Sequence, residues 1–189
     1  EKRFLDELSD ATHVITWDFK EEWYSRAKKL VQVCTPGAGR ELVAVPQNNT
    51  VKVHFGSYHG AIMAENVAAF ILAWARGFYL PEMSKRWCRA EVSDKIYPVA
   101  GTKAVIAGYG NVGKAIGSLL EKLGIAVVGF GRRNLERLPL ESENADWFVM
   151  ALPGTDETAD FLNRKLLSHL PRKAVVINVG RGKSVDEKA

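Results

Sequence analysis

The sequence predicts an α/β protein built on parallel sheets, and three observations support this fold class. Apolar runs typical of strands alternate with amphipathic helical stretches, which is the sequence form of a parallel sheet with crossover helices. A glycine-rich turn separates one such run from one such helix between residues 103 and 124. With 47% hydrophobic and 25% charged residues, the chain has the composition of an ordinary folded globular protein.

The first half of the chain begins with short strands. Runs of apolar and β-branched residues predict strands at residues 12–17, 30–37 and 51–55, and a helical pattern lies between the first two, at residues 20–30. The third strand leads into the loop Gly56–Gly60.

A long, strongly apolar helix is expected at residues 61–77. Apolar side chains recur at helical spacing, and Gly77 can cap the C-terminus. We expect this helix to join two domains, at residues 1–60 and 61–189. Residues 78–101 are mixed in character and indicate a surface connector.

The second half consists of alternating strands and helices. Its first three elements form a compact βαβ unit, in which Gly124 ends the helix. A further strand, helix and strand follow in the same order. The expected bounds are 103–110, 111–124 and 125–130 for the βαβ unit, then 146–152, 157–170 and 174–180.

The turn of the βαβ unit has the sequence Gly108-Tyr109-Gly110-Asn111-Val112-Gly113. In a G-x-G-x-x-G turn the first glycine permits the tight turn, the second lets backbone approach a pyrophosphate, and the third lets the helix pack on the strand. The helix N-terminus adds N–H groups and a positive dipole end. A turn that binds nothing is the alternative, but strand, motif, helix and second strand in this order favour a Rossmann-type dinucleotide site.

The residues after the second strand indicate which dinucleotide. Gly131 stands where NAD-specific domains place an acidic residue that binds the ribose hydroxyls, and Arg132 and Arg133 follow it. A carboxylate there repels a 2′-phosphate, whereas guanidinium groups bind phosphate oxygens in a bidentate fork. We therefore expect NADP, with NAD as the second candidate; the alternative is that both arginines are solvated loop charges.

The predicted strands also end at other unusual residues. Ligands of an open α/β sheet bind at the carboxyl ends of its strands. Those ends carry the glycine motif, the two arginines, the segment Leu152–Thr155 and the Gly-Arg-Gly around Arg181. We expect all four to lie at one edge of one sheet.

Composition and charge argue against several other classes of protein. The 26 Lys and Arg against 22 Asp and Glu give a net charge of +4, but the basic residues are scattered, which argues against a nucleic-acid surface. The longest apolar run, residues 68–75, is too short to cross a bilayer, and no signal-peptide pattern is found, so we expect a cytoplasmic protein without a membrane partner. Cys34 and Cys88 match no metal or disulfide spacing, so no metal is expected.

Four segments together resemble the D-isomer-specific 2-hydroxyacid dehydrogenases. They are AENVAAFILAWARG, IAGYGNVGKAIG, DWFVMALPGTDETADFLN and VVINVGRGKSVDEKA, in this order. The resemblance covers most of the chain and implies a partial flavodoxin-like α/β substrate domain at residues 1–60 and a partial Rossmann-type dinucleotide-binding domain at 61–189. It also implies a homodimer formed through the helix at 61–77 and the connector that contains Trp87; a helix buried within one chain is the alternative explanation of the same apolar pattern.

The resemblance assigns a catalytic role to Arg181, in the R-G motif. This residue would bind the substrate carboxylate and polarise the C2 carbonyl, a task that suits a planar cation with fixed donors. The alternative is that Arg181 caps its loop or pairs with Asp186.

Two further groups of residues take roles from the resemblance. Backbone N–H groups of Ser57, Tyr58 and His59 would hold the substrate anion, although His59 also suits a purely polar loop position. Three residues after the strand at 146–152 would lie against the cofactor, namely Leu152, Pro153 and Thr158. Thr155 is also a candidate N-cap of the next helix.

Some family features have no counterpart in the sequence. The acid/base histidine of the family and its partner glutamate follow the R-G motif, but no His lies between Arg181 and Ala189. The start of the substrate domain and the stretch at residues 133–146 are shorter than the resemblance implies. We therefore expect a fragment, or a sequence with omitted segments, and the His and Glu beyond residue 189.

Together these features predict an NAD(P)-dependent oxidoreductase that interconverts 2-keto acids and D-2-hydroxy acids by hydride transfer, with NADP preferred. Glyoxylate and hydroxypyruvate are the first substrates to test. A dinucleotide-sensing binding protein similar to dehydrogenase-like corepressors is the alternative on the same fold. The R-G motif argues against a third candidate, a relative of alanine dehydrogenase or adenosylhomocysteine hydrolase.

Overall fold

The structure is a computed structural model that describes residues 2–46, 50–80 and 89–189. The chain divides into two compact units, residues 1–59 and 60–189, and each unit has its own hydrophobic core. The predicted boundary, after residue 60, lies next to this division. The binding roles predicted for the two domains stay predictions.

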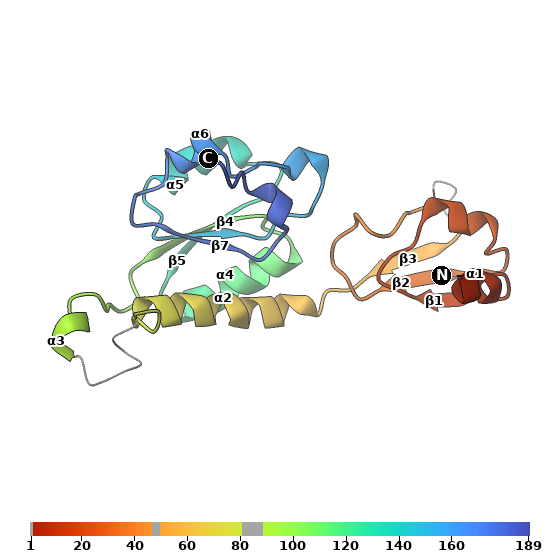
Figure 1. The fold of residues 1–189 in the computed structure, drawn as a ribbon, viewed down its shortest axis with the longest axis horizontal. Coiled ribbons are helices and arrows are strands. Elements are labelled where there is room, and N and C mark those ends of the chain that lie inside the picture. The colour runs from red at the N-terminus through yellow and green to blue at the C-terminus, as the bar shows by residue number, and fades with distance from the viewer. Residues whose placement is uncertain (1, 47–49, 81–88) are drawn as a thin grey trace. The chain divides into compact units, whose positions relative to one another are not determined.

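The first unit contains a parallel sheet with the strand order β1-β2-β3. Figure 1 shows these strands side by side at the red and orange end of the chain. Buried side chains such as Val14 and Val33 point from the sheet into a core that includes Phe19 and Trp23. The elements are α1 Lys2–Leu8, β1 His13–Ile15, η1 Glu21–Ser25, β2 Gln32–Thr35 and β3 Lys52–Phe55.

The helix predicted at residues 20–30 is wrong. The structure has only the short 3-10 helix η1 there, and turns follow it, such as the one in which Leu30 N–H donates to the Ala27 carbonyl at 3.2 Å. Trp23, Ala27 and Leu30 are all buried. Their spacing therefore indicates only that these side chains face the same side of the segment. Successive i to i+3 turns can place them there as well as an α-helix can.

The second unit is built on a four-stranded parallel sheet with the order β5-β4-β6-β7, which confirms the predicted parallel α/β class. All four residues of the central strand β6 are buried, as expected for a parallel strand covered on both faces. The strands are β4 Lys103–Ala107, β5 Ala126–Phe130, β6 Trp147–Met150 and β7 Val175–Asn178.

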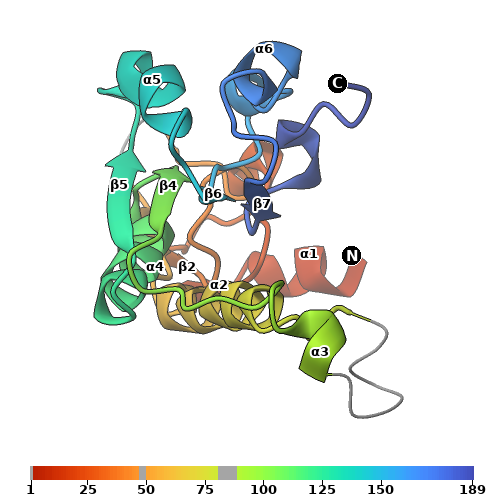
Figure 2. The same ribbon diagram turned by 90° about the vertical axis from the view of Figure 1, so that its left-hand side faces the viewer.

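Helices cover both faces of this sheet. Successive strand residues point to opposite faces, so Ala104 and Ile106 lie in one core and Val105 and Ala107 in the other. Figure 2 shows α2 and α4 on one side of the sheet and α5 and α6 on the other. These helices span His59–Ala75 (α2), Asn111–Lys122 (α4), Leu138–Ser142 (α5) and Arg164–Leu167 (α6).

Glycines end the two long helices as predicted. Gly77 follows α2 with a φ of 70°, and Gly124 follows α4 with a φ of 78°, a backbone conformation that favours glycine. After α2 the predicted connector lies partly outside the described residues, and its described part includes α3, Arg89–Val92. Among the described residues, none of the helices has the length and apolar character needed to cross a membrane.

The single helix predicted at residues 157–170 is also wrong. The structure has a 3-10 helix, η4 Asp156–Thr158, and then the separate helix α6. Between them Ala159 is extended, with a ψ of 136°, and Asp160 has a φ of 48°. Asn163 starts α6 anew, because its side chain accepts a hydrogen bond from Leu166 N–H at 3.1 Å.

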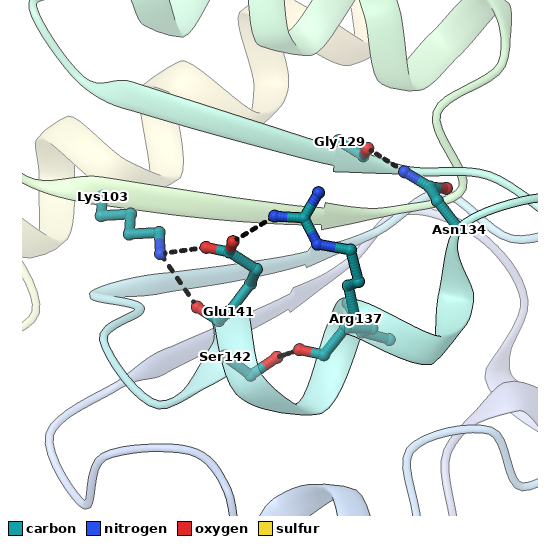
Figure 3. A network of polar contacts seen from close by, with 7 residues as sticks. Lys103, Gly129, Asn134, Arg137, Glu141 and Ser142 are labelled. Atoms are coloured by element: carbon teal, nitrogen blue, oxygen red, sulfur yellow. Dashed lines mark hydrogen bonds and ion pairs between the residues drawn. The ribbon is translucent and has the colours of Figure 1, made fainter.

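Helix α5 is fixed to the start of β4 by an ion pair (Figure 3). Lys103 Nζ donates to the Glu141 carboxylate at 2.8 Å and to the Glu141 carbonyl at 3.1 Å. Arg137 Nη2 reaches the same carboxylate at 3.1 Å from η3, Leu135–Arg137. The hydrogen bond and charge of Lys103 lower the pKa of Glu141 from its ordinary value. This anchor lies at the amino edge of the sheet, so it supports the fold rather than a site at the carboxyl edge.

Candidate functional site

The predicted cofactor-binding residues and Arg181 lie at the carboxyl edge of the second-unit sheet. All four strands are parallel, so the loops that follow them lie at the same edge. The chain leaves β4 toward β5 on one side and later adds β6 on the other, which makes the space between β4 and β6 the topological switch point. Ligands of such sheets bind in the crevice outside this point.

The first and third glycines of the motif make close contacts that no side chain permits. Gly108 has a φ of 97°, and a Cβ placed on it would lie 2.5 Å from the Ala151 carbonyl oxygen. A Cβ on Gly113 would lie 2.2 Å from the Gly108 carbonyl oxygen. The loops after β4 and β6 are therefore packed backbone to backbone, and α4 starts directly against the turn, as the motif requires.

The second glycine, in contrast, faces open space. No atom outside its chain neighbours lies within 4 Å of a Cβ placed on Gly110, which is the N-cap residue of α4. A side chain there would fill the space in front of the first turn of a 12-residue helix. Backbone N–H groups and the positive end of the helix dipole suit a phosphate at this place, so the residues fit a dinucleotide.

The other residues of the motif differ in what they offer a ligand. Asn111 is exposed as the first residue of α4, whereas Val112 packs against the core and offers mainly its main chain. The ring of Tyr109 lies over β5, because a Cβ on Gly129 would lie 2.2 Å from Tyr109 Cδ2. Tyr109 N–H donates to the Phe130 carbonyl at 2.9 Å. The side chain of Tyr109 therefore fixes the loop to β5.

The two arginines lie at the centre of a tight turn after β5. Asn134 N–H donates to the Gly131 carbonyl at 3.3 Å, which closes a four-residue turn around Arg132 and Arg133. Both arginines are exposed. No atom outside its chain neighbours lies within 4 Å of a Cβ placed on Gly131, so the space before the arginines is open.

Arg132 also faces an acidic residue of the neighbouring loop. Its Nη2 lies 3.7 Å from Glu157 Oε2, and the two side chains are 81% and 76% exposed. Exposed ion pairs of this kind contribute about 0–1 kcal/mol. A doubly charged phosphate can therefore displace this carboxylate.

The loop after β6 is tied together by Thr158. The Thr158 hydroxyl lies 2.6 Å from the Pro153 carbonyl, and Thr155 N–H donates to the same hydroxyl at 3.1 Å. Thr155 is the N-cap of η4, as predicted for the element that follows the strand. Leu152 is buried in the core. Thr158 and Leu152 thus shape the loop, and Pro153 is half-buried at its surface.

Arg181 follows β7 at the same edge. Its carbonyl accepts hydrogen bonds from Asn178 Nδ2 at 3.0 Å and from Ser184 Oγ at 2.6 Å, which close the turn into η5, Gly182–Ser184. A Cβ on Gly154 would lie 2.9 Å from Arg181 Cγ, so the side-chain stem lies on the β6 loop. The main chain of Arg181 therefore holds the loop, and the residue itself is exposed.

The predicted anion loop belongs to the first unit, at the carboxyl end of β3. Ser57 and Tyr58 are exposed, whereas His59 is the first residue of α2 rather than a loop residue. The Tyr58 and His59 rings stack at 4.2 Å, and Trp17 lies 6.0 Å from the His59 ring. Gly56 N–H donates to the Thr35 carbonyl at 2.8 Å, which ties the loop to the end of β2.

Asn134 and Glu157 were not predicted as site residues from the sequence. Asn is common in turns because its side chain bonds to nearby backbone, so the letters after the two arginines carried a signal for Asn134. Glu157 carried none, because only the sheet order brings it to Arg132. Within residues 2–46, 50–80 and 89–189, no cluster of three or more His, Cys, Asp or Glu side chains suits a metal ion.

The chain is similar to proteins of a known family. Residues 68–189 match the family described as "D-isomer specific 2-hydroxyacid dehydrogenase, NAD binding domain". A glyoxylate/hydroxypyruvate reductase of Arabidopsis thaliana is 35% identical over 98 residues, which cover 48% of this chain and 30% of that protein. A glyoxylate reductase of Pyrococcus furiosus is 29% identical over 213 residues, which cover 100% of this chain and 63% of the relative.

Solved structures agree in fold. A D-isomer specific 2-hydroxyacid dehydrogenase from Xanthobacter autotrophicus Py2, in complex with NADPH and MES, matches with a TM-score of 0.78 and 28% identity. The match covers 95% of this chain and 61% of that one. The chain thus spans less than two thirds of each of these relatives.

Proposed function

Because the chain belongs to the D-isomer specific 2-hydroxyacid dehydrogenase family, we propose that it acts in an NADP-preferring reductase of 2-keto acids to D-2-hydroxy acids. One observation carries the proposal: an open glycine turn, an arginine turn and Arg181 lie at one edge of one parallel sheet. The names of the relatives suggest glyoxylate and hydroxypyruvate as substrates.

Two separate groups of residues would bind the two phosphate-containing parts of the cofactor. The N-terminus of α4 and the open face of Gly110 would hold the pyrophosphate. Arg132 and Arg133 would bind the 2′-phosphate that distinguishes NADP from NAD, since Gly131 offers no carboxylate to repel it. The Xanthobacter relative supports this choice, because its structure is a complex with NADPH. Leu152, Pro153 and Thr158 would form the wall beside the cofactor.

Arg181 would act on the substrate. A bound NADPH supplies a hydride to C2 of the keto acid. The Arg181 guanidinium is a planar, permanently charged donor that can bind the carboxylate and stabilise the negative charge that develops on the C2 oxygen. That oxygen also takes up a proton, which the acid/base histidine of the family would donate; none of the 4 histidines of this sequence lies at the carboxyl edge of the second-unit sheet. Within the first unit, the backbone N–H groups of Ser57, Tyr58 and His59 would offer donors to an anion at the carboxyl end of β3.

Helix α2 has an apolar face that is partly exposed. Along α2, Val67 and Ile71 are buried, but Phe70 is 59% and Trp74 40% exposed, and Trp74 stacks on Tyr79 at 4.2 Å. We propose this apolar face as the contact of a homodimer in the cytoplasm. Trp87, which was predicted to take part, lies outside the described residues. The names of the relatives lend no support to the sensing alternative.

A steady-state assay tests the proposed reaction. The complete protein should oxidise NADPH when glyoxylate or hydroxypyruvate is added, with a kcat/KM at least about tenfold higher than with NADH, which corresponds to about 1.4 kcal/mol of discrimination. The reason is that two guanidinium groups meet a phosphate in one case and a hydroxyl in the other. A protein that binds the cofactor but reduces no 2-keto acid, or one that favours NADH, contradicts the proposal.

A further inference from the structure

The arginine turn is held by the side chain that follows it. Asn134 Oδ1 accepts a hydrogen bond from Gly131 N–H at 2.8 Å, and Asn134 Nδ2 donates to the Gly129 carbonyl at 3.3 Å. Figure 3 shows the second of these bonds, which reaches back to the end of β5. One half-buried side chain therefore ties the residue that follows Arg132 and Arg133 to the main chain that precedes them.

Gly129, which accepts the second of these bonds, is itself held by the glycine loop at residues 108–113. The Tyr109 ring occupies the place of a side chain on Gly129, since a Cβ there would lie 2.2 Å from Tyr109 Cδ2. The main chain of the glycine loop also bonds to β5, because Gly108 and Tyr109 N–H both donate to the Phe130 carbonyl, at 2.8 and 2.9 Å. The glycine loop and the arginine turn, residues 131–134, thus both contact the last residues of β5.

We propose that Asn134 is a positioning residue for cofactor selection, which it exerts by holding the turn in which Arg132 and Arg133 stand. This inference rests on the proposed role of the two arginines. Asn134 acts through them, because its two polar groups are occupied by Gly131 and Gly129. Long exposed side chains lose conformational freedom when they bind a phosphate. A main chain that is already ordered keeps this loss confined to the side chains.

Loss of the two Asn134 side-chain hydrogen bonds, which together brace the turn, should affect the two cofactors differently. NADPH and NADH share the pyrophosphate and the nicotinamide, and they differ at the 2′ position only. Loosening the turn therefore weakens the contact that NADPH alone makes. A general loss of folding, in contrast, weakens the binding of both.

A control for structural damage exists in the same unit. Asn163 makes an equivalent brace, since its Oδ1 accepts from Leu166 N–H at 3.1 Å and its Nδ2 donates to the Asp160 carbonyl at 3.3 Å. That brace starts α6 and does not contact the arginine turn. Asn163→Ala therefore removes the same chemistry without disturbing the proposed phosphate site.

The test is a fluorescence titration of NADPH and NADH on the complete protein and its variants. Asn134→Ala is expected to raise the Kd for NADPH about three- to tenfold and the Kd for NADH less than about twofold, or 0.65–1.4 kcal/mol of selective loss for NADPH. Asn163→Ala should leave the ratio of the two constants unchanged. Asn134→Ser, whose hydroxyl can make one of the two bonds, should give a smaller selective loss and serves if the alanine variant does not fold.

Three outcomes separate this inference from the function on which it rests. If Asn134→Ala leaves both constants unchanged, or raises both equally as Asn163→Ala does, Asn134 is not a positioning residue for selection. That result leaves the proposed function intact as long as Arg132→Ala/Arg133→Ala removes the preference for NADPH. If the double arginine variant keeps the preference, the assignment of the phosphate site fails, and the inference about Asn134 fails with it.

Discussion

Arg181→Ala should reduce kcat/KM for a 2-keto acid about 10²- to 10³-fold, which is the effect of removing one preorganised donor to a developing oxyanion, about 2.7–4 kcal/mol. Arg181→Lys should recover only part of this loss, because an ammonium group keeps the charge but not the planar fork that matches a carboxylate. The Kd for NADPH should change less than about twofold in either variant. Steady-state kinetics and a cofactor titration measure both quantities.

The fold should tolerate these changes. The hydrogen bonds that close the loop use the carbonyl of Arg181, which any residue provides to Asn178 and Ser184. Arg172→Ala is the matched control, because Arg172 precedes β7 at the opposite edge of the sheet. It should keep full activity. An Arg181→Ala enzyme with unchanged kcat and KM shows that the guanidinium only supports its loop, which was the alternative at the level of the sequence.

Arg132→Ala/Arg133→Ala should raise the Kd for NADPH at least about tenfold and leave the Kd for NADH within about twofold. Charge-assisted hydrogen bonds contribute about 1.5–3 kcal/mol each, so the loss of even one accounts for a tenfold change. Arg137→Ala is the matched control, because Arg137 lies close by in the chain but pairs with Glu141 at 3.1 Å. Equal effects on both cofactors would contradict the assignment.

A third substitution sharpens the same experiment. No atom outside its chain neighbours lies within 4 Å of a Cβ on Gly131, so the site has room for an acidic side chain. Adding Gly131→Asp to the double variant supplies the carboxylate that NAD-specific domains use for the ribose hydroxyls. The triple variant should therefore bind NADH more tightly than the double variant does. If NADH binding stays the same, the ribose does not lie at this turn.

The sequence was sufficient for the parts of the fold that are local or continuous. The strand, glycine turn, helix and strand at residues 103–130 could be predicted, because β4 is a buried apolar strand, β5 is also apolar and Gly124 ends the helix. The position of the arginine turn followed from the same unit. In each case the signal and the structure lie within one short stretch of chain.

Features that depend on tertiary packing could not be predicted. The apolar spacing at residues 20–30 and 157–170 indicated long helices, but the structure satisfies the same burial with short turns. The break at Asp160 coincides with a main-chain bond from Asp160 N–H to the Lys183 carbonyl at 2.9 Å, from a segment beyond β7. Two other contacts likewise join separate segments of the chain. They are the ion pair of Arg132 with Glu157 and the packing of the Tyr109 ring on Gly129.

Direct binding of cofactor to the unmodified protein tests whether the turn from Gly131 to Asn134 selects NADPH. Titration of the complete protein with NADPH and with NADH, at one fixed and moderate salt concentration, should give a Kd for NADPH at least about tenfold lower. The difference should shrink as salt is added, because exposed charge pairs are screened. Equal dissociation constants, or tighter binding of NADH, would contradict a role of this turn in selecting NADPH.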